Sequence, residues 1–273
     1  MPMSVNVLIL RTAGTNCDQE TDFAFRLAGA RTTLLHVNAL RADPGCLGGI
    51  HVLAIPGGFS YGDDLGAGKV LANELLASLR APLERFLDEG KLMIGICNGF
   101  QVLVKTGLLP GLHRWKQQAT LTFNDSHRFE DRWTYLEAPK SVCVLAQSGE
   151  RLYLPVAHAE GKLVLESESV LDQMRRNGQI VYRYTDAAGR SVGYPWNPNG
   201  SVDNIAGICD PTGRILGMMP HPERHCLPLH DPRWPRDGLK QEGEGLRVFR
   251  RAVRFVEENL LPAGPPRQAA AAR

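Results

Sequence analysis

The sequence predicts an α/β fold: a mostly parallel open sheet with helices on both faces, and additional short antiparallel strands. One observation predicts the parallel part. Short apolar runs alternate with segments of helical composition through the first hundred residues, and this strand-helix-strand alternation is typical of a parallel sheet covered on both faces. A second observation predicts the antiparallel strands: a series of short strand-like runs joined by turn-rich loops follows.

The first half of the chain contains the elements of the parallel part. Strands are predicted over Val5 to Leu10, Thr33 to Val37, Val52 to Ile55 and Lys91 to Ile96. The segment from Gln19 to Ala28 has helical composition and stops at Gly29. Leucine and alanine recur at helical spacing from Val70 to Leu87, and we expect Pro82 to split this helix into two pieces.

The second half is richer in turns. Short polar segments from Leu112 to Trp133 predict a hairpin rather than a strand-helix-strand unit. Further short strands are predicted over Val142 to Leu145, Leu152 to Val156, Leu163 to Leu165, Ile180 to Tyr184, Ile205 to Cys209 and Ile215 to Met219. An amphipathic helix from Gly245 to Leu261 closes the predicted domain, which spans residues 4–261. The Pro- and Ala-rich residues 262–273 are expected to be a disordered tail.

Composition excludes several classes of function. The chain has 273 residues, 43% of them hydrophobic, so it can bury the core of one large domain. A net charge of +2 and the lack of dense basic clusters argue against nucleic-acid binding. No apolar stretch is long enough for a membrane span. The six cysteines are scattered without a Cys-x-x-Cys pair, which predicts reduced thiols and a cytoplasmic location. They are Cys17, Cys46, Cys97, Cys143, Cys209 and Cys226.

The strongest functional signal is the stretch from Gly95 to Gly99, directly after an apolar run. A glycine two residues before and two residues after Cys97 predicts a sharp strand-to-helix corner, because a Cβ at either site would meet crossing backbone. Such a corner places the thiol at the positive end of a helix, which favours the thiolate form of a cysteine. Cys97 is therefore the predicted nucleophile.

Two more loops follow predicted strands and are expected at the same edge of the sheet. His221 and Glu223 lie in a Pro-His-Pro-Glu segment; in an extended backbone, residues two apart point to the same side. The histidine can move the thiol proton while the carboxylate orients its ring, so Cys97, His221 and Glu223 form a predicted triad. Gly57 and Gly58 follow another strand, and their amides, with the Asn98 amide, suit an oxyanion hole.

Three other sequence patterns suggest a functional site at first but do not support one. Residues 63–70 end in Gly-Lys-Val but lack the first glycine and the Ser or Thr of a P-loop, so no nucleotide site is predicted. His221, His225 and Cys226 have the residue types of metal ligands, but a proline interrupts their spacing, and we expect no metal there. His158 is expected to be a structural histidine with satisfied hydrogen bonds.

With these residues in place, the chain resembles the class I (triad) glutamine amidotransferases, which have a flavodoxin-like fold. Within them it is most similar to the glutaminase subunits of phosphoribosylformylglycinamidine synthases, which serve purine biosynthesis. The matching segments are residues 14–18, 55–63, 95–101, 155–161, 197–201 and 217–224. The Phe-Ser-Tyr-Gly-Asp stretch at 59–63 and the Asn-Pro-Asn-Gly-Ser stretch at 197–201 point to this branch.

The resemblance implies specific roles. Cys97 attacks the side-chain amide of glutamine, and Gly58 and Asn98 supply the oxyanion amides. Gln101, like Gly57, is implied to lie against the bound glutamine. Ammonia then passes to a large synthetase subunit, commonly through a complex that includes a small bridging subunit. The resemblance implies no cofactor in this chain, with ATP and Mg²⁺ used by the synthetase.

Three other functions stay open at this point: a glutaminase subunit of a different amidotransferase, an intracellular cysteine hydrolase or peptidase of similar fold, and a non-catalytic module that has kept the fold. The segments Arg11 to Ala13 and Leu227 to Gly243, and the Ala-rich tail, depart from the short bacterial pattern. These departures bear on the partner interface and leave the triad intact.

Overall fold

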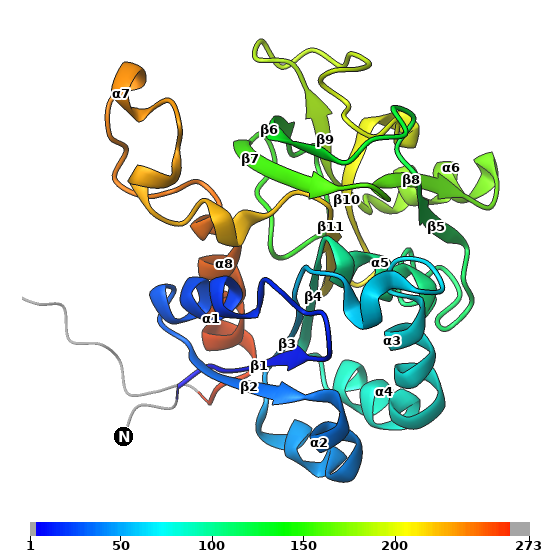
Figure 1. Ribbon diagram of the computed structural model, residues 1–273. Coiled ribbons are helices and arrows are strands. Elements are labelled where there is room, and N and C mark those ends of the chain that lie inside the picture. Colours follow the sequence, from blue (N-terminus) through cyan, green and yellow to red (C-terminus); the bar gives the residue numbers. More distant parts are fainter. Residues whose placement is uncertain (1–3, 263–273) are drawn as a thin grey trace, which may run out of the picture.

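The computed structural model describes residues 4–262, which form a nine-stranded mixed sheet and a separate pair of strands (Figure 1). The order in the large sheet is β2-β1-β3-β4-β11-β10-β9-β6-β7, and β5 pairs with β8. The strands are β1 (Asn6–Arg11), β2 (Arg31–His36), β3 (Val52–Ile55), β4 (Leu92–Ile96), β5 (Ala119–Thr122), β6 (Glu130–Glu137), β7 (Arg151–His158), β8 (Lys162–Leu165), β9 (Ile180–Thr185), β10 (Ile205–Cys209) and β11 (Ile215–Met218). The α-helices are α1 (Asp18–Leu27), α2 (Val37–Ala42), α3 (Lys69–Glu74), α4 (Arg80–Asp88), α5 (Asn98–Lys105), α6 (Glu168–Asn177), α7 (Trp234–Asp237) and α8 (Leu246–Asn259).

The parallel half of the sheet consists of β2, β1, β3, β4 and β11. Every residue of β3, β4 and β11 is buried, which fits central strands covered on both faces. Figure 1 shows α1 and α8 on one side of these strands and α3, α4 and α5 on the other. Phe25 of α1 and Phe249 of α8 meet edge to face with ring centroids 4.9 Å apart, so the two helices form one layer.

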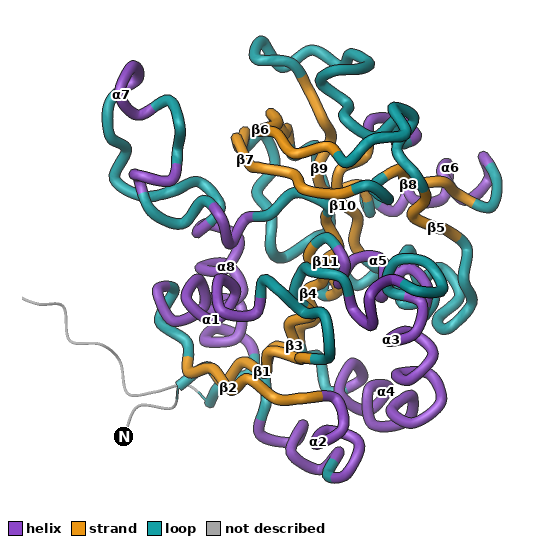
Figure 2. The backbone as a smooth tube through the Cα atoms, viewed as in Figure 1, coloured by secondary structure: helices purple, strands orange, loops and turns teal. Residues whose placement is uncertain are grey.

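The antiparallel half begins at β10, which runs opposite to β11 and continues through β9, β6 and β7. Along β7 buried residues alternate with more exposed ones, as expected for a strand with one face on the core. Figure 2 shows most helices around the parallel half, while the antiparallel half carries longer loops. The predicted fold class, an α/β sheet with additional antiparallel strands, is confirmed.

Two local predictions are wrong. Val142 to Leu145 is not a strand, because the amides of Val142 and Val144 bond two different loop residues, Gly178 and Gly213, instead of one neighbouring strand. The segment from Leu112 to Trp133 is not a hairpin. Its two strands pair elsewhere, β5 with β8 and β6 with β7 and β9.

The long helix predicted over Val70 to Leu87 is split into two pieces, as the sequence predicted. A π-helical turn at Leu75–Leu79 separates α3 from α4. Pro82 lies in the first turn of α4, where an amide hydrogen has no intrahelical partner to lose. The helices α2, α6 and α7 were not predicted.

The segment from Leu227 to Gly243 contains a short 3₁₀ helix and α7, and it extends away from the sheet in Figure 1. Within the segment, Asp231 forms ion pairs with Arg233 and Lys240. The Arg233 guanidinium lies 3.7 Å from the ring centroid of Tyr153 on β7. The segment is therefore folded against the antiparallel half through one charged cluster.

Among the described residues, no helix is both long and apolar enough to cross a membrane. The predicted tail, residues 262–273, lies outside the described residues except for residue 262. The assignment of residues 4–261 to a single glutaminase domain stays a prediction.

Candidate active site

One edge of the sheet gathers the predicted functional residues. Because β1, β3, β4 and β11 are parallel, their carboxyl ends lie at the same edge. The loops that follow them carry Cys17, Gly57, Cys97 and His221. A Cβ built at Gly57 would lie 3.1 Å from the Cys17 sulfur, 3.4 Å from Cys97 Cβ and 2.9 Å from His221 Cε1. The three side chains thus surround the same glycine.

Cys97 occupies the predicted corner between β4 and α5. Its backbone has φ 51° and ψ −105°, a conformation that a residue with a Cβ rarely adopts. Its amide donates to the carbonyl oxygen of Met218 at 2.8 Å, which ties the corner to β11. A Cβ at Gly99 would lie 1.9 Å from the Ile55 carbonyl oxygen, and one at Gly95 would lie 2.6 Å from the Gly99 backbone. The two glycines therefore make this corner possible, as the sequence predicted.

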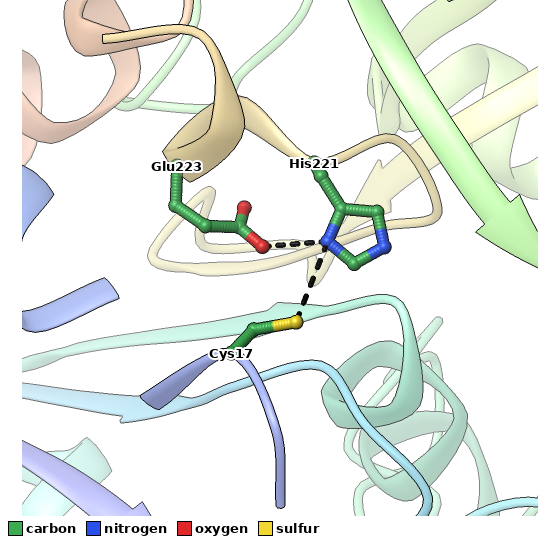
Figure 3. A group of neighbouring side chains, drawn as sticks. All are labelled: Cys17, His221 and Glu223. Carbon is green, nitrogen blue, oxygen red and sulfur yellow. Dashed lines mark hydrogen bonds and ion pairs between the residues drawn. The ribbon is translucent and has the colours of Figure 1, made fainter. Parts of the chain in front are cut away.

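His221 and Glu223 form a buried pair. His221 Nδ1 lies 2.5 Å from Glu223 Oε1 (Figure 3). The backbone between them is not fully extended, as the sequence had suggested. His221 is extended, but a 3₁₀ turn starts at Pro222, because the fixed φ of proline suits the first position of a helix. The His221 amide donates to Pro155 of β7 at 2.8 Å, which fixes the loop.

The surroundings of His221 favour the protonated ring. Burial alone lowers its pKa, but the Glu223 carboxylate and then Cys97 and Cys17 outweigh burial and raise the pKa well above its usual range. Nε2 is buried and has no hydrogen-bond partner among the described residues. The ring can therefore exchange a proton at Nε2 while Nδ1 stays bonded to the carboxylate.

Cys17 belongs to the same cluster, although the sequence pointed to no role for it. Its sulfur lies 4.0 Å from His221 Nδ1 and accepts a hydrogen bond from Arg224 Nη2 at 3.2 Å. The sulfur, Nδ1 and a carboxylate oxygen of Glu223 all lie within 4.8 Å of one another (Figure 3). One signal was available: Cys17 follows the first predicted strand, at the same edge as the other loops.

These three residue types also bind zinc. Two observations argue against a resident metal ion here. Nδ1 of His221 and Oε1 of Glu223 are already hydrogen-bonded to each other, and the Arg224 cation lies against the Cys17 sulfur. His225 and Cys226 do not join the cluster. His225 Nδ1 bonds the Tyr153 carbonyl oxygen, and the Cys226 sulfur lies at main-chain carbonyl oxygens of Pro222 and Glu223.

A small cleft of about 40 Å³ opens at Cys97. Its lining includes Gly58, Phe59, Asp63, Ala67, Cys97, Gln101 and residues 157–160. Gln101 donates to the Glu160 carbonyl oxygen at 2.7 Å, so its side chain forms part of the wall. Burial and the nearby charge of Glu160 raise the pKa of Asp63. Gly57 lies under the histidine rather than along this wall, and its contact with glutamine stays a prediction.

The two predicted oxyanion donors flank the nucleophile. Asn98 opens α5, where an amide has no intrahelical partner. Gly58 has φ +137°, and a Cβ there would lie 2.5 Å from the Asn16 amide nitrogen. The Asn98 side chain accepts from the Ser60 amide and donates to Asp63, so the loop after β3 is tied to α5. These hydrogen bonds keep the backbone amides of Gly58 and Asn98 close to each other.

His158 ends β7 and lines the cleft. Burial, with a smaller contribution from the charge of His221, lowers its pKa to about 3. Its Nδ1 lies 3.1 Å from the Asn124 side-chain oxygen. This residue is therefore neutral and hydrogen-bonded at Nδ1, but its buried Nε2 has no partner among the described residues, so the expectation of satisfied hydrogen bonds is met at one ring nitrogen only.

Comparison with known proteins gives concordant matches. Residues 4–256 match the family described as the CobB/CobQ-like glutamine amidotransferase domain. A Dehalococcoides mccartyi protein named phosphoribosylformylglycinamidine synthase subunit PurQ is 54% identical over 256 residues, covering 93% of this chain and 98% of that protein. An Archaeoglobus fulgidus protein of the same name is 40% identical over 270 residues, with coverages of 93% and 98%.

A solved structure also aligns along most of the chain. A chain of the structure described as PurLQS from Thermotoga maritima aligns with a TM-score of 0.70 and 28% sequence identity. The alignment covers 93% of this chain and 100% of that chain.

Proposed function

Because the chain belongs to the CobB/CobQ-like glutamine amidotransferase family, we propose that it is the glutaminase subunit of a phosphoribosylformylglycinamidine synthase. Its relatives from D. mccartyi and A. fulgidus are named as such subunits and are covered along almost their whole length. The observation that carries the proposal is the meeting of Cys97 with the His221–Glu223 pair at one edge of the sheet. In this role the chain releases ammonia from glutamine for purine biosynthesis.

The reaction begins at the Cys97 sulfur. With the thiol proton already held at His221 Nε2, the Cys97 sulfur attacks the side-chain carbonyl carbon of glutamine as a thiolate. The amides of Gly58 and Asn98 donate hydrogen bonds to the resulting oxyanion, and each such donor contributes about 3 kcal/mol to transition-state stabilisation. As the carbon–nitrogen bond breaks, the imidazolium returns the proton to nitrogen. Ammonia leaves, and a γ-glutamyl thioester remains on Cys97.

Water completes the cycle. His221 accepts a proton from a water molecule that attacks the thioester carbonyl, and the same proton then returns to the departing thiolate. Glutamate is the second product. Through both steps Glu223 holds the ring in one tautomer and stabilises its positive charge. Gln101 in the cleft wall, and Gly57 beneath the ring, complete the proposed glutamine site.

The ammonia passes to a synthetase subunit, which uses ATP and Mg²⁺ to convert formylglycinamide ribonucleotide to formylglycinamidine ribonucleotide. A small third subunit bridges the two. This chain requires no cofactor for its own step, since the thiol, imidazole and carboxylate supply the nucleophile and the proton transfers. We assign the complex to the cytoplasm, a location consistent with six free cysteines.

The test is glutamate release from glutamine, measured for the wild-type chain with and without the synthetase subunit. Wild type is expected to be slow alone and faster in the complex, and Cys97→Ala is expected to release essentially no glutamate in either. Cys46→Ala is the matched control, because this partly exposed thiol lies in the turn before β3. Equal rates for Cys97→Ala and wild type would overturn the proposal.

A further inference from the structure

The backbone around Cys17 fixes the position of its sulfur. The Cys17 amide donates to the Gly57 carbonyl oxygen at 3.1 Å, and the Asn16 amide shares that acceptor at 3.2 Å. On the other side, the Cys17 carbonyl oxygen accepts from the Thr21 amide at 3.0 Å and the Thr21 hydroxyl at 2.6 Å. Cys17 is 1% exposed. The residue is thus held between the glycine loop after β3 and the first turn of α1.

The sulfur lies where the catalytic pair needs support. It lies 4.0 Å from His221 Nδ1, the nitrogen that bonds Glu223 (Figure 3). Arg224 donates to it at 3.2 Å, and Arg224 is itself held by Glu20 of α1, with Nε 3.3 Å from the carboxylate. The sulfur therefore separates a guanidinium group from the imidazole ring.

Gly57 closes the other side of this space. A Cβ at Gly57 would lie 2.9 Å from His221 Cε1 and 3.1 Å from the Cys17 sulfur. The Nδ1–Cε1 edge of the ring consequently lies in a narrow slot between the glycine backbone and the sulfur. Removing the sulfur would open one wall of that slot, and the ring could then tilt away from Glu223.

Resting on the proposed function, we propose that Cys17 is a positioning residue for the glutaminase reaction. Its sulfur holds the His221 ring in the orientation in which Nδ1 bonds Glu223 and Nε2 stays open to Cys97. The thiol itself does not react, because burial raises the pKa of Cys17 and keeps it protonated. A neutral, polarisable sulfur fills the slot without competing for the substrate.

The ring's protonation responds to every charged or titratable group that faces it. These groups are Cys17 before α1, Cys97 after β4, His158 at the end of β7, Glu223 and Arg224 in the 3₁₀ turn, and Glu20 of α1 through Arg224. Loss of the Cys17 sulfur removes one hydrogen-bond acceptor beside Nδ1 and therefore destabilises the protonated form of the ring. A positioning role therefore predicts a shifted pH dependence as well as a slower reaction.

The test compares Cys17→Ala and Cys17→Ser in the full chain, assayed in complex with the synthetase subunit. For Cys17→Ala we expect kcat for glutamine hydrolysis to fall about tenfold, because a tilt below 1 Å of a catalytic group costs less than about a hundredfold. KM should change less than about twofold, since Cys17 does not line the cleft. Cys17→Ser keeps a hydrogen-bonding group and should recover most of the rate.

The second readout needs no glutamine. The rate of Cys97 alkylation by iodoacetamide is followed by peptide mass spectrometry as a function of pH. In Cys17→Ala the pH midpoint of Cys97 alkylation should move upward by about 0.5 to 1 pH unit. The reason is that the His221 ring is protonated less readily and so stabilises the Cys97 thiolate less. A wild-type chain that hydrolyses no glutamine would refute the proposed function. The alkylation profile tests the positioning role of Cys17 separately, because it does not depend on glutamine hydrolysis.

Cys226→Ala is the matched control. This thiol is also 1% exposed and lies in the loop of His221, but its sulfur donates hydrogen bonds to the main-chain oxygens of Pro222 and Glu223. The control should lower thermal stability and leave the pH midpoint in place. Wild-type kcat and midpoint in Cys17→Ala would overturn the positioning role. So would an equal midpoint shift in Cys226→Ala, which would show general loosening of the loop.

Discussion

Adding one methyl group at Gly57 tests the convergence of the three loops. In Gly57→Ala the new Cβ would lie 2.9 Å from His221 Cε1, and ordinary contacts of a Cβ begin at 3.4 Å. The ring must therefore move by at least about 0.5 Å, since the neighbouring Cys17 sulfur and Cys97 Cβ leave little room at 3.1 and 3.4 Å. Because a 1 Å misplacement can cost about a hundredfold, we expect kcat to fall about tenfold or more.

The folded state should also lose stability. Overpacking of this kind costs about 1–3 kcal/mol, which lowers Tm by about 2–10 °C in a chain of this size. Gly57 does not have a positive φ, so the substitution tests space and not backbone strain. The assays are glutamate release in the complex and thermal denaturation. Gly49→Ala is the control, because a Cβ there meets nothing within 4 Å. A rate for Gly57→Ala within twofold of wild type would refute the convergence at this glycine.

Three further predictions concern charge and backbone. Glu223→Gln should lower kcat about 10- to 100-fold, less than His221→Ala, because the amide orients the ring without stabilising its charge; equal losses in a glutaminase assay would contradict this. Since the pKa of His158 is about 3 when folded and about 6.5 when unfolded, stability is lost as pH falls from 6.5, by about 2 kcal/mol at pH 5. His158→Gln should flatten that loss in denaturation curves, and an unchanged slope would rule it out. Gly99→Ala should yield insoluble protein, because its Cβ would lie 1.9 Å from the Ile55 carbonyl oxygen; a soluble, active variant would disprove the corner.

The convergence of Cys97, His221 and Glu223, the proposed nucleophile and its partners, could be predicted from the sequence because each has a local signal. Glycines on both sides of Cys97 require a sharp corner, and prolines on both sides of His221 mark a fixed loop. Their meeting in space depended on the strands being parallel neighbours, which the sheet order confirms. The fold class could be read in the same way from alternating strands and helices.

Cys17 and Arg224 could not be assigned this way. Cys17 follows a predicted strand and lies in the matching segment 14–18, but neither signal indicates what its sulfur contacts, which depends on β1 lying beside β3. The same limit explains the wrong strand at Val142 to Leu145, where the apolar residues predict a strand but no neighbouring strand among the described residues pairs with them. Pairing partners in the antiparallel half depend on long-range contacts that local periodicity does not contain.

Covalent trapping at the nucleophile tests the central claim most directly. The chain is treated with a glutamine-like diazo-ketone, with and without excess glutamine, and the modified peptide is identified by mass spectrometry. We predict modification at Cys97 alone, prevented by glutamine, with Cys17 unlabelled despite lying beside the same histidine. Labelling at Cys17 or at another thiol, or labelling that glutamine does not prevent, would contradict the account.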